Sequence, residues 1–205
     1  MNTEDELTSA LNRALAEHPD HLRRLRERLA LEADTEGILD VACRTIDSPV
    51  GTLLLAATQQ GLVRVAYSNE DHDAVVQNLA QRISPRILAA PARLDVAARE
   101  LDEYFRGLRQ HFDLPIDWRL STGFRSTVLR HLPDIAYGHT ASYSIVAELA
   151  GNPKAIRAVG TACATNPLPV IIPCHRVVRA DGTLGGYLGG VETKRTLLAL
   201  EAAAA

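Results

Sequence analysis

Apolar residues recur at every third or fourth position over residues 3–33, which predicts two helices. Pro19 interrupts the pattern, and Asp20 is a suitable N-terminal cap for the second helix. This second helix has one narrow apolar stripe, made of Leu22, Leu25 and Leu29. Gly37 ends the segment, so we expect residues 1–37 to form a helical extension that packs on the main body.

From residue 38 onward the apolar pattern changes to the alternation that is typical of strands. Three strands are predicted, at residues 41–45, 53–57 and 62–67. Prolines and glycines mark short turns between them, at residues 48–51 and 59–61. Consecutive strands joined by short turns predict a small antiparallel meander.

Two helices are expected in the same unit, at residues 71–83 and 93–109, with a short extended piece near residues 86–88 between them. Residues 38–115 therefore indicate a small N-terminal α/β domain with an antiparallel sheet. Nothing in this domain has the pattern of a catalytic site.

Residues 111–118 contain Pro115 and predict a linker, after which residues 118–205 indicate a mostly helical C-terminal domain. Its predicted helices lie near residues 124–132, 144–150, 153–165 and 191–204. Gly151 and Asn152 end one helix and cap the next, and so tight a turn is typical of a helix-turn-helix. A helical hairpin inside a core explains this pattern equally well. The fold class of the whole chain is expected to be α+β.

The charge of the chain is unevenly distributed. Its formal net charge is −3, but residues 118–205 hold nine basic and five acidic residues. A modest positive excess is compatible with nucleic-acid binding that weakens as salt increases. A solvated surface explains the same charges, so charge alone does not decide between these interpretations.

The three cysteines, Cys43, Cys163 and Cys174, are an odd number without a Cys-x-x-Cys pair. This pattern argues against a disulfide framework and predicts reduced thiols. The seven histidines are scattered, so we expect neither a metal site nor a cofactor. No apolar run approaches the ~18 residues of a membrane helix, and the acidic N-terminus is unlike a secretory signal. We therefore expect a cytoplasmic protein with no membrane partner.

The candidate chemistry lies in Pro173-Cys174-His175-Arg176, which follows a very apolar stretch with two more prolines. Proline removes backbone donors, so we expect a stiff, buried lead-in rather than a central strand. A neighbouring imidazole or cation increases the thiolate fraction of a cysteine, so the motif is typical of a reactive thiol. An inert cysteine beside a structural histidine explains it as well, because free cysteine is among the most buried residue types.

Five glycines between residues 182 and 190 surround Tyr187. So many glycines indicate a phosphate cradle, the wall of a ligand pocket or a flexible turn. The segment lacks the Lys-Ser/Thr ending of a phosphate-binding P-loop. Tyr187 offers a hydroxyl donor on this segment.

These motifs together resemble the O6-alkylguanine-DNA alkyltransferases, also called methylated-DNA–protein-cysteine methyltransferases. The stretch Asn166–Val178 is similar to the active-site signature of that family. Similar motifs flank it at Ala141–Tyr143, Gly151–Gly160, Gly186–Tyr187 and Leu197–Glu201. The resemblance covers residues 38–201 and is strongest over residues 138–201, so residues 1–36 fall outside it.

The resemblance implies DNA repair by direct damage reversal, in which an alkyl group moves irreversibly from O6-alkylguanine to Cys174, once per protein molecule. His175, through a water, and Glu201 then favour the thiolate. Asn166 holds the active-site turn, and Tyr187 donates a proton or hydrogen bond to the guanine. The sequence does not decide whether O4-alkylthymine is also repaired.

The resemblance also implies that the partner is double-stranded DNA, bound through its minor groove with the damaged base flipped out. The backbone of Val177 and Leu188 then reads the base edge. Tyr143 presses on the DNA backbone, and Arg157 fills the gap that the base leaves. Lys154 joins the same substrate-binding set, and a monomer is expected.

Some positions depart from the family pattern. Ile156 and Thr161 are bulkier than the usual residues of the groove-binding helix, and Leu188 stands where some relatives have Ser or Arg. Cys43 lacks partners for the zinc site of some members.

Three other classes remain open. The main alternative is a non-catalytic alkyl-lesion-binding protein, but such proteins typically replace the cysteine with tryptophan. A transcription regulator of this family would carry a separate domain with a metal-binding cysteine cluster. A Cys-His hydrolase would turn over through an acyl-enzyme intermediate.

Overall fold

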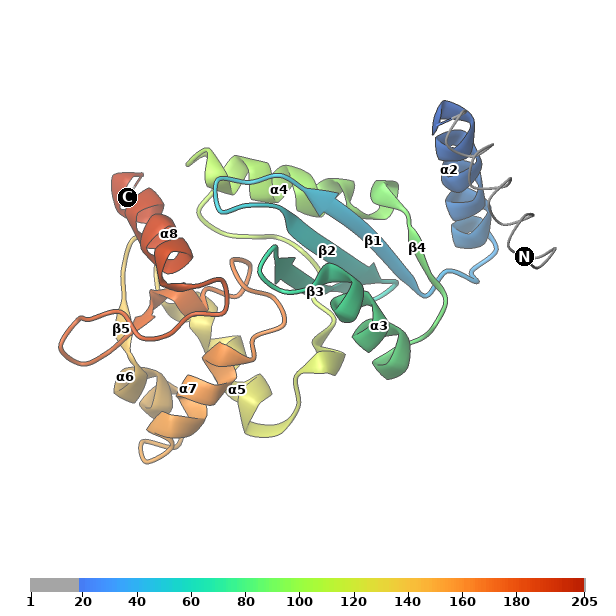
Figure 1. The fold of residues 1–205 in the computed structure, drawn as a ribbon. Coiled ribbons are helices and arrows are strands. Elements are labelled where there is room, and N and C mark those ends of the chain that lie inside the picture. Colours follow the sequence, from blue (N-terminus) through green and yellow to red (C-terminus); the bar gives the residue numbers. More distant parts are fainter. Residues whose placement is uncertain (1–18, 205) are drawn as a thin grey trace, which may run out of the picture.

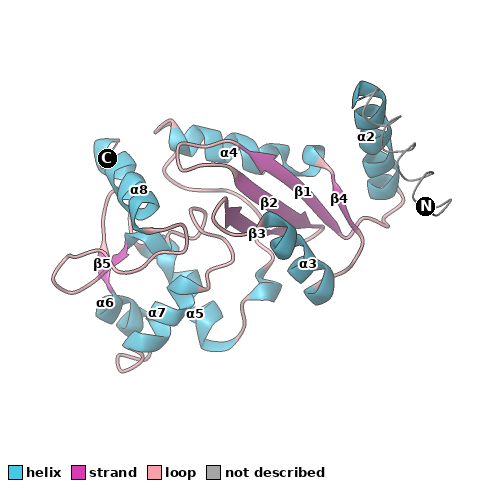
Figure 2. Ribbon diagram, in the orientation of Figure 1, coloured by secondary structure: helices cyan, strands magenta, loops and turns pink. Residues whose placement is uncertain are grey.

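Two structural units lie side by side in the computed structural model, which describes residues 19–204 (Figure 1). Strands dominate the core of the first unit and helices dominate the second (Figure 2), so the predicted α+β class is confirmed. The first of the two helices expected over residues 3–33 lies outside the described residues. Within residues 19–204, no helix is both long enough and apolar enough to cross a membrane.

The helix α2 (Pro19–Thr35) confirms the second expected helix of the extension, but it packs through other residues than the leucine stripe. Leu25 and Leu29 are 48% and 53% exposed, whereas Ala30 and Ala33 are buried. The small alanine side chains form the contact with the main body. The helix therefore packs on the main body through its alanines rather than through the apolar stripe that the sequence singled out.

The main sheet has the strand order β3-β2-β1-β4. The strands β1 (Val41–Ile46), β2 (Leu53–Thr58) and β3 (Gly61–Tyr67) form the predicted antiparallel meander. The strand β4 (Ile87–Ala89) corresponds to the expected short extended piece and pairs in parallel with β1. A helix between β3 and β4 carries the chain back across the sheet, so β4 runs in the same direction as β3. Because β1 also runs in that direction, β4 and β1 pair in parallel.

Helices cover both faces of this sheet (Figure 1). The helix α4 (Asp95–Phe105) packs its Leu101 and Tyr104 on one face, in a cluster with Leu53 and Leu55 of β2. The helix α3 (His72–Arg82) packs Leu79 on the other face. Every residue of β2 is therefore buried, which explains its continuous apolar sequence.

The second unit consists of short helices around the segment that contains Cys174. Its helices are α5 (Gly123–His131), α6 (Tyr143–Leu149), α7 (Ile156–Ala164) and α8 (Val191–Ala203). Short 3-10 turns complete it: η2 (Trp118–Leu120), η3 (Leu132–Asp134) and η4 (Cys174–Arg176). In the first unit, η1 (Pro91–Leu94) leads into α4.

The helices α6 and α7 form the predicted helix-turn-helix. Buried Val146 and Val159 pack between them, and the turn is closed by a hydrogen bond from Ala155 N to Asn152 O at 2.9 Å. Because of this turn, α7 begins at Ile156 rather than near residue 153. The strands β5 (Ala141–Ser142) and β6 (Val177–Val178) pair in parallel and connect the start of α6 to the end of the Cys174 segment.

The predicted linker lies along the edge of the main sheet. Leu62 N donates to Pro115 O at 2.8 Å, and Asp117 N donates to Leu62 O at 2.9 Å. Gly61 makes this approach possible, because a Cβ atom there would lie 2.1 Å from Pro115 O. Gly61 also has a φ of +139°, which side chains disfavour.

We predict that Gly61→Ala lowers the free energy of unfolding by more than about 2 kcal/mol, because the linker must move away from β3. Urea unfolding measures this loss. The matched control is Gly37→Ala, where φ is +69° but no atom lies within 4 Å of the added Cβ. The free energy of unfolding of this control should fall by only about 1 kcal/mol, the conformational penalty of a side chain at positive φ. Equal losses in the two variants would show that the linker contact does not stabilise the fold.

Candidate active site

Cys174 lies at the start of the turn η4, inside the second unit. Its side chain is only 1% exposed. The amide Nδ2 of Asn166 donates a hydrogen bond to its Sγ at 3.1 Å. Pro173 precedes it, so the sulfur is carried by a stiff and buried segment, as the three prolines predicted.

Asn166 closes the loop that leads to Cys174. Its Nδ2 also donates to Ile172 O at 2.9 Å, and its Oδ1 accepts from Leu168 N at 3.0 Å. Within the loop, Val170 has a φ of 71°, in the left-handed region that β-branched residues rarely adopt. The fully buried asparagine thus stabilises an unfavourable loop conformation and directs it toward the sulfur.

Behind Cys174, the carboxylate of Glu201 on α8 is surrounded by hydrogen-bond donors. Its Oε1 lies 2.8 Å from His175 Nε2 and 2.8 Å from the hydroxyl of Tyr104. Arg176 donates to both oxygens at 2.9 Å, and Gly138 N donates to Oε2 at 3.2 Å. A buried charge is tolerated only when it is paired and hydrogen-bonded in this way.

This network keeps Glu201 ionised and His175 neutral. Burial opposes ionisation of the carboxyl, but hydrogen bonds from His175 and Arg176 outweigh it and lower the pKa of Glu201 to about 2. Burial also lowers the pKa of His175 below its ordinary value, against the effect of the carboxylate. Because Nε2 carries its proton toward Glu201, Nδ1 is the acceptor nitrogen, and it has no partner within residues 19–204.

The sulfur itself is held as a thiol. Burial raises the pKa of Cys174 to about 11, although the hydrogen bond from Asn166, the positive charge of Lys194 and a hydrogen bond from Tyr187 act in the opposite direction. At neutral pH the proton must therefore leave the sulfur during the reaction rather than before it.

Lys194 is a buried cation next to the site. Its side chain is fully buried, and Nζ donates to Val177 O at 2.6 Å. Burial lowers the pKa of Lys194 below its ordinary value. The backbone at Val177, which the resemblance assigns to base reading, is thus held in place by a charged donor.

Tyr187 lies where the two units meet. Its hydroxyl is 2.7 Å from the hydroxyl of Tyr67, the last residue of β3. The two rings meet edge to face, with centroids 5.8 Å apart. Asn69 Nδ2 donates to Leu188 O at 3.0 Å, so the first unit holds the glycine-rich segment at two neighbouring points.

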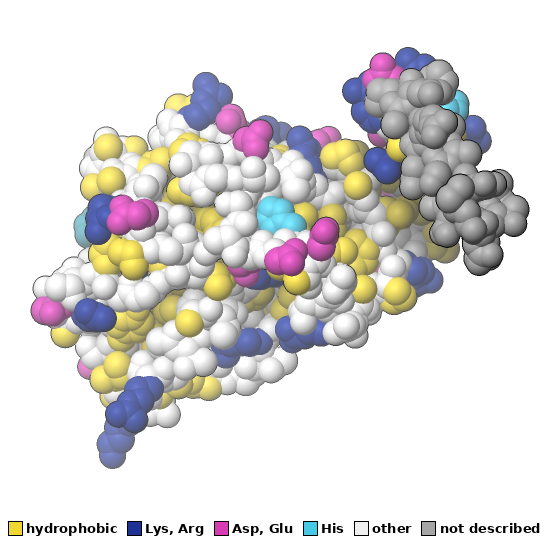
Figure 3. Space-filling view, viewed as in Figure 1, with side chains coloured by type: hydrophobic (Ala, Val, Ile, Leu, Met, Phe, Trp, Pro, Cys, Tyr) yellow, Lys and Arg dark blue, Asp and Glu magenta, His cyan; other side chains and the backbone are white. Residues whose placement is uncertain are grey.

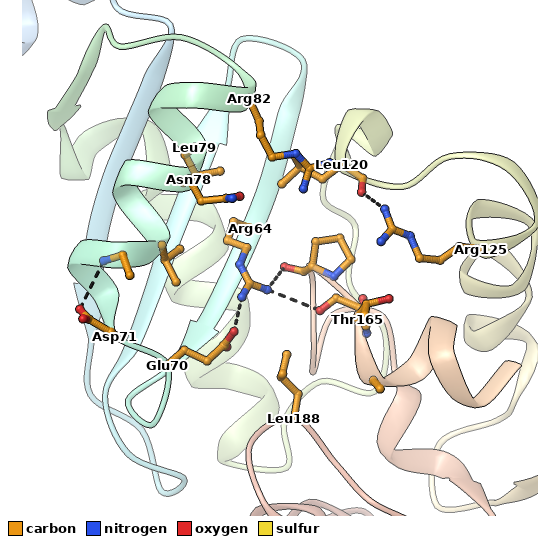
Figure 4. Close-up of a pocket in the computed structure, with 15 residues that line it drawn as sticks. Arg64, Glu70, Asp71, Asn78, Leu79, Arg82, Leu120, Arg125, Thr165 and Leu188 are labelled. Atoms are coloured by element: carbon orange, nitrogen blue, oxygen red, sulfur yellow. Dashed lines mark hydrogen bonds and ion pairs between the residues drawn. The ribbon is translucent and has the colours of Figure 1, made fainter. Parts of the chain in front are cut away.

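Arg64 of β3 connects the first unit to the turn before the Cys174 loop. It forms an ion pair with Glu70 and donates to Pro167 O at 3.2 Å (Figure 4). Together with residues of α3, these side chains line a cavity of about 510 Å³ that Asn166 and Leu188 also line. The cavity lies between the units, beside the sulfur-bearing loop.

The DNA-contact candidates are distributed over the helix-turn-helix. Arg157 in the first turn of α7 and Lys154 in the turn before it are exposed. Tyr143 begins α6 and is half-buried, and a Cβ on Gly185 would lie 2.5 Å from its hydroxyl. Tyr143 therefore packs directly against the glycine-rich segment.

The structure thus brings the five candidate catalytic residues together around the sulfur. They are Cys174, His175, Asn166, Tyr187 and Glu201. Val177 and Leu188 adjoin this group, whereas Arg157 and Lys154 lie on the exposed helix-turn-helix.

Sequence reasoning missed four residues of the network: Arg176 as a partner of Glu201, and Tyr104, Tyr67 and Lys194 altogether. Arg176 was visible as a neighbour of the Cys-His pair. Tyr104 and Tyr67 had only the apolar spacing of a helix and a strand, which indicates core packing. No pattern singled out Lys194.

Two family models match the chain. The model described as 6-O-methylguanine DNA methyltransferase, ribonuclease-like domain, matches residues 41–118. The model described as 6-O-methylguanine DNA methyltransferase, DNA binding domain, matches residues 123–203.

Curated relatives match over most of the chain. A methylated-DNA–protein-cysteine methyltransferase of Mycolicibacterium paratuberculosis is 40% identical over 158 residues, which cover 77% of this chain and 90% of that protein. The bifunctional transcriptional activator/DNA repair enzyme Ada of Escherichia coli is 37% identical, over 97% of this chain but only 57% of Ada.

Solved structures agree with these matches. The O6-methylguanine methyltransferase of Mycobacterium tuberculosis has a TM-score of 0.71 at 38% identity, and covers 80% of this chain and 94% of that one. A structure of M. tuberculosis OGT in complex with DNA has a TM-score of 0.70. The chain therefore belongs to the methylated-DNA–protein-cysteine methyltransferase family.

Proposed function

We propose that the protein repairs DNA by moving the alkyl group of O6-alkylguanine onto Cys174 Sγ. The bond between sulfur and the alkyl carbon forms as the bond between that carbon and guanine O6 breaks. The thiol loses one proton and the restored guanine gains one, so atoms and charge balance. The observation that carries the proposal is the buried sulfur with the His175–Glu201 pair behind it.

The proton of the thiol leaves toward His175 in this proposal. The neutral imidazole has Nδ1 as its acceptor nitrogen, and a water between Nδ1 and Sγ completes the path. Glu201 then stabilises the imidazolium that forms. Tyr187 donates to the guanine as its alkyl group leaves, and Asn166 keeps the sulfur aligned for attack.

The product is a thioether, which water and ordinary thiols do not cleave readily. Each chain therefore reacts once, and Cys174 is the acceptor rather than a recycled nucleophile. A non-catalytic lesion-binding protein is the alternative function, and the presence of a cysteine at position 174 argues against it.

On the DNA side, we propose that α7 enters the minor groove of a duplex. Lys154 contacts phosphate, Tyr143 presses on the backbone, and Arg157 occupies the space of the flipped nucleotide. Figure 3 shows basic side chains along the lower edge of the molecule, where Figure 1 places α5, α6 and α7. We propose a monomer acting in the cytoplasm.

Entry of the base requires a movement, because Cys174 is only 1% exposed. We propose that residues 182–186 of the glycine-rich segment move, since their three glycines impose little conformational restriction, while Tyr187 and Leu188 stay bonded to Tyr67 and Asn69. The backbone of Val177 and Leu188 then reads the edge of the base.

Transfer is tested with a duplex that contains O6-methylguanine, followed by intact and peptide mass measurement. We expect one methyl group per chain, located on the peptide with Cys174. Cys174→Ala should abolish transfer and leave DNA affinity largely intact, because the sulfur makes no contact needed for groove binding. Repeated turnover would indicate a hydrolase, and DNA binding without any mass change would indicate the lesion-binding alternative.

Arg157→Ala should slow transfer from duplex DNA by about tenfold, since it removes part of the compensation for extruding the base. Transfer from the free O6-alkylguanine base needs no extrusion and should keep its rate. Arg195→Ala, which changes an exposed arginine on α8, is the matched control and should leave both rates unchanged. Equal slowing with duplex and free base would contradict the role given to Arg157.

The charge state of Glu201 is tested by NMR titration of its carboxyl carbon, with Glu201→Gln to assign the signal. We expect a midpoint at about 2. The folded pKa is below the ordinary value of 4.5, so this group stabilises the fold above pH 4.5 and the stabilisation is lost as the pH falls toward 2. Over this pH range, the free energy of unfolding falls by about 3 kcal/mol through this group. An ordinary midpoint would show that His175 and Arg176 do not hold the carboxylate.

A further inference from the structure

Tyr67 is a residue of the first unit that reaches the chemistry of the second. It ends β3, is 1% exposed, and directs its hydroxyl to within 2.7 Å of the hydroxyl of Tyr187. A Cβ atom on Gly189 would lie 2.8 Å from its ring carbons, so the ring also packs closely on the glycine-rich segment.

Several contacts keep Tyr67 in one position. Its backbone N donates to Glu70 Oε1 at 3.0 Å, and its carbonyl lies 3.1 Å from His72 Nε2. Glu70 in turn pairs with Arg64, which donates to Pro167 O at 3.2 Å. The backbone of Tyr67 is thus held by the same group of residues that supports the turn before Cys174.

The hydroxyl of Tyr187 needs a partner of this kind. Burial raises the pKa of Tyr187 well above its ordinary value, so the phenol keeps its proton at neutral pH. The hydroxyl of Tyr187 has only one proton to donate. When that proton points to the guanine, the oxygen of Tyr187 is free to accept a hydrogen bond from another donor. Tyr67 is placed to donate to that oxygen, and a donor that itself accepts a hydrogen bond becomes a stronger donor.

We infer that Tyr67 is a positioning residue for alkyl transfer, which orients the hydroxyl of Tyr187 toward the reacting guanine. This inference rests on the proposed function, in which Tyr187 donates to the base. It gives the ribonuclease-like domain a direct part in the reaction, through a hydrogen bond that crosses between the units.

The test is a double-mutant cycle on single-turnover transfer from duplex O6-methylguanine. Tyr67→Phe keeps the ring and removes only the hydroxyl, so the fold is preserved. We expect a transfer rate about five- to tenfold lower, the cost of one buried hydrogen bond. Tyr187→Phe should be at least as slow. The double variant should be no slower than Tyr187→Phe alone, because Tyr67 acts only through Tyr187.

The control is Tyr137→Phe, which removes another buried tyrosine hydroxyl, one without a partner in the described part of the chain. It should transfer at the rate of the unmodified protein. Affinity for undamaged duplex DNA should be the same in all four variants. Additive slowing in the double variant, or a normal rate for Tyr67→Phe beside a slow Tyr187→Phe, would overturn the inference alone. A normal rate for Tyr187→Phe would overturn the role proposed for Tyr187 as well.

Discussion

The buried carboxylate of Glu201 is the interaction on which the rest of the site depends. It holds α8 against the turn that carries Cys174, and through Tyr104 it also holds α4 of the first unit. A buried ion pair is weak as a source of stability, because desolvation offsets most of the attraction. Its effect here is orientation: with Arg176 neutralising the charge, Glu201 sets the tautomer of His175 and turns Nδ1 into the acceptor.

The raised pKa of Cys174 is consistent with a protein that reacts once. A permanent thiolate at an open surface would react with any electrophile, and each such event would consume the molecule. Here burial keeps the sulfur protonated and only 1% exposed, while Asn166, Lys194 and Tyr187 act in favour of the charged form. In the proposed reaction, the balance between these effects changes when a base enters and the proton can move to His175. Selectivity then comes from access and proton transfer rather than from an intrinsically reactive sulfur.

Much of the fold was predictable because its signals are local. Alternation and turn residues located the meander of β1, β2 and β3, and the motif around Cys174 located the loop that Asn166 closes. The packing of α2 was not predictable in the same way. Its leucines have helical spacing, yet Ala30 and Ala33 form the contact, since the choice of face depends on how closely two backbones approach.

The residues that the sequence did not identify were missed for one physical reason. Tyr104 bonds to Glu201 across 97 positions of the chain, and Tyr67 bonds to Tyr187 across 120. A tyrosine with an apolar ring at a core position has the same spacing as phenylalanine, so its pattern does not reveal whether the hydroxyl finds a distant partner. Both tyrosines belong to the unit in which no catalytic pattern was found. In the proposed reaction, that unit contributes through geometry: the end of β3 places the hydroxyl of Tyr67 beside Tyr187, and α4 places the hydroxyl of Tyr104 beside Glu201.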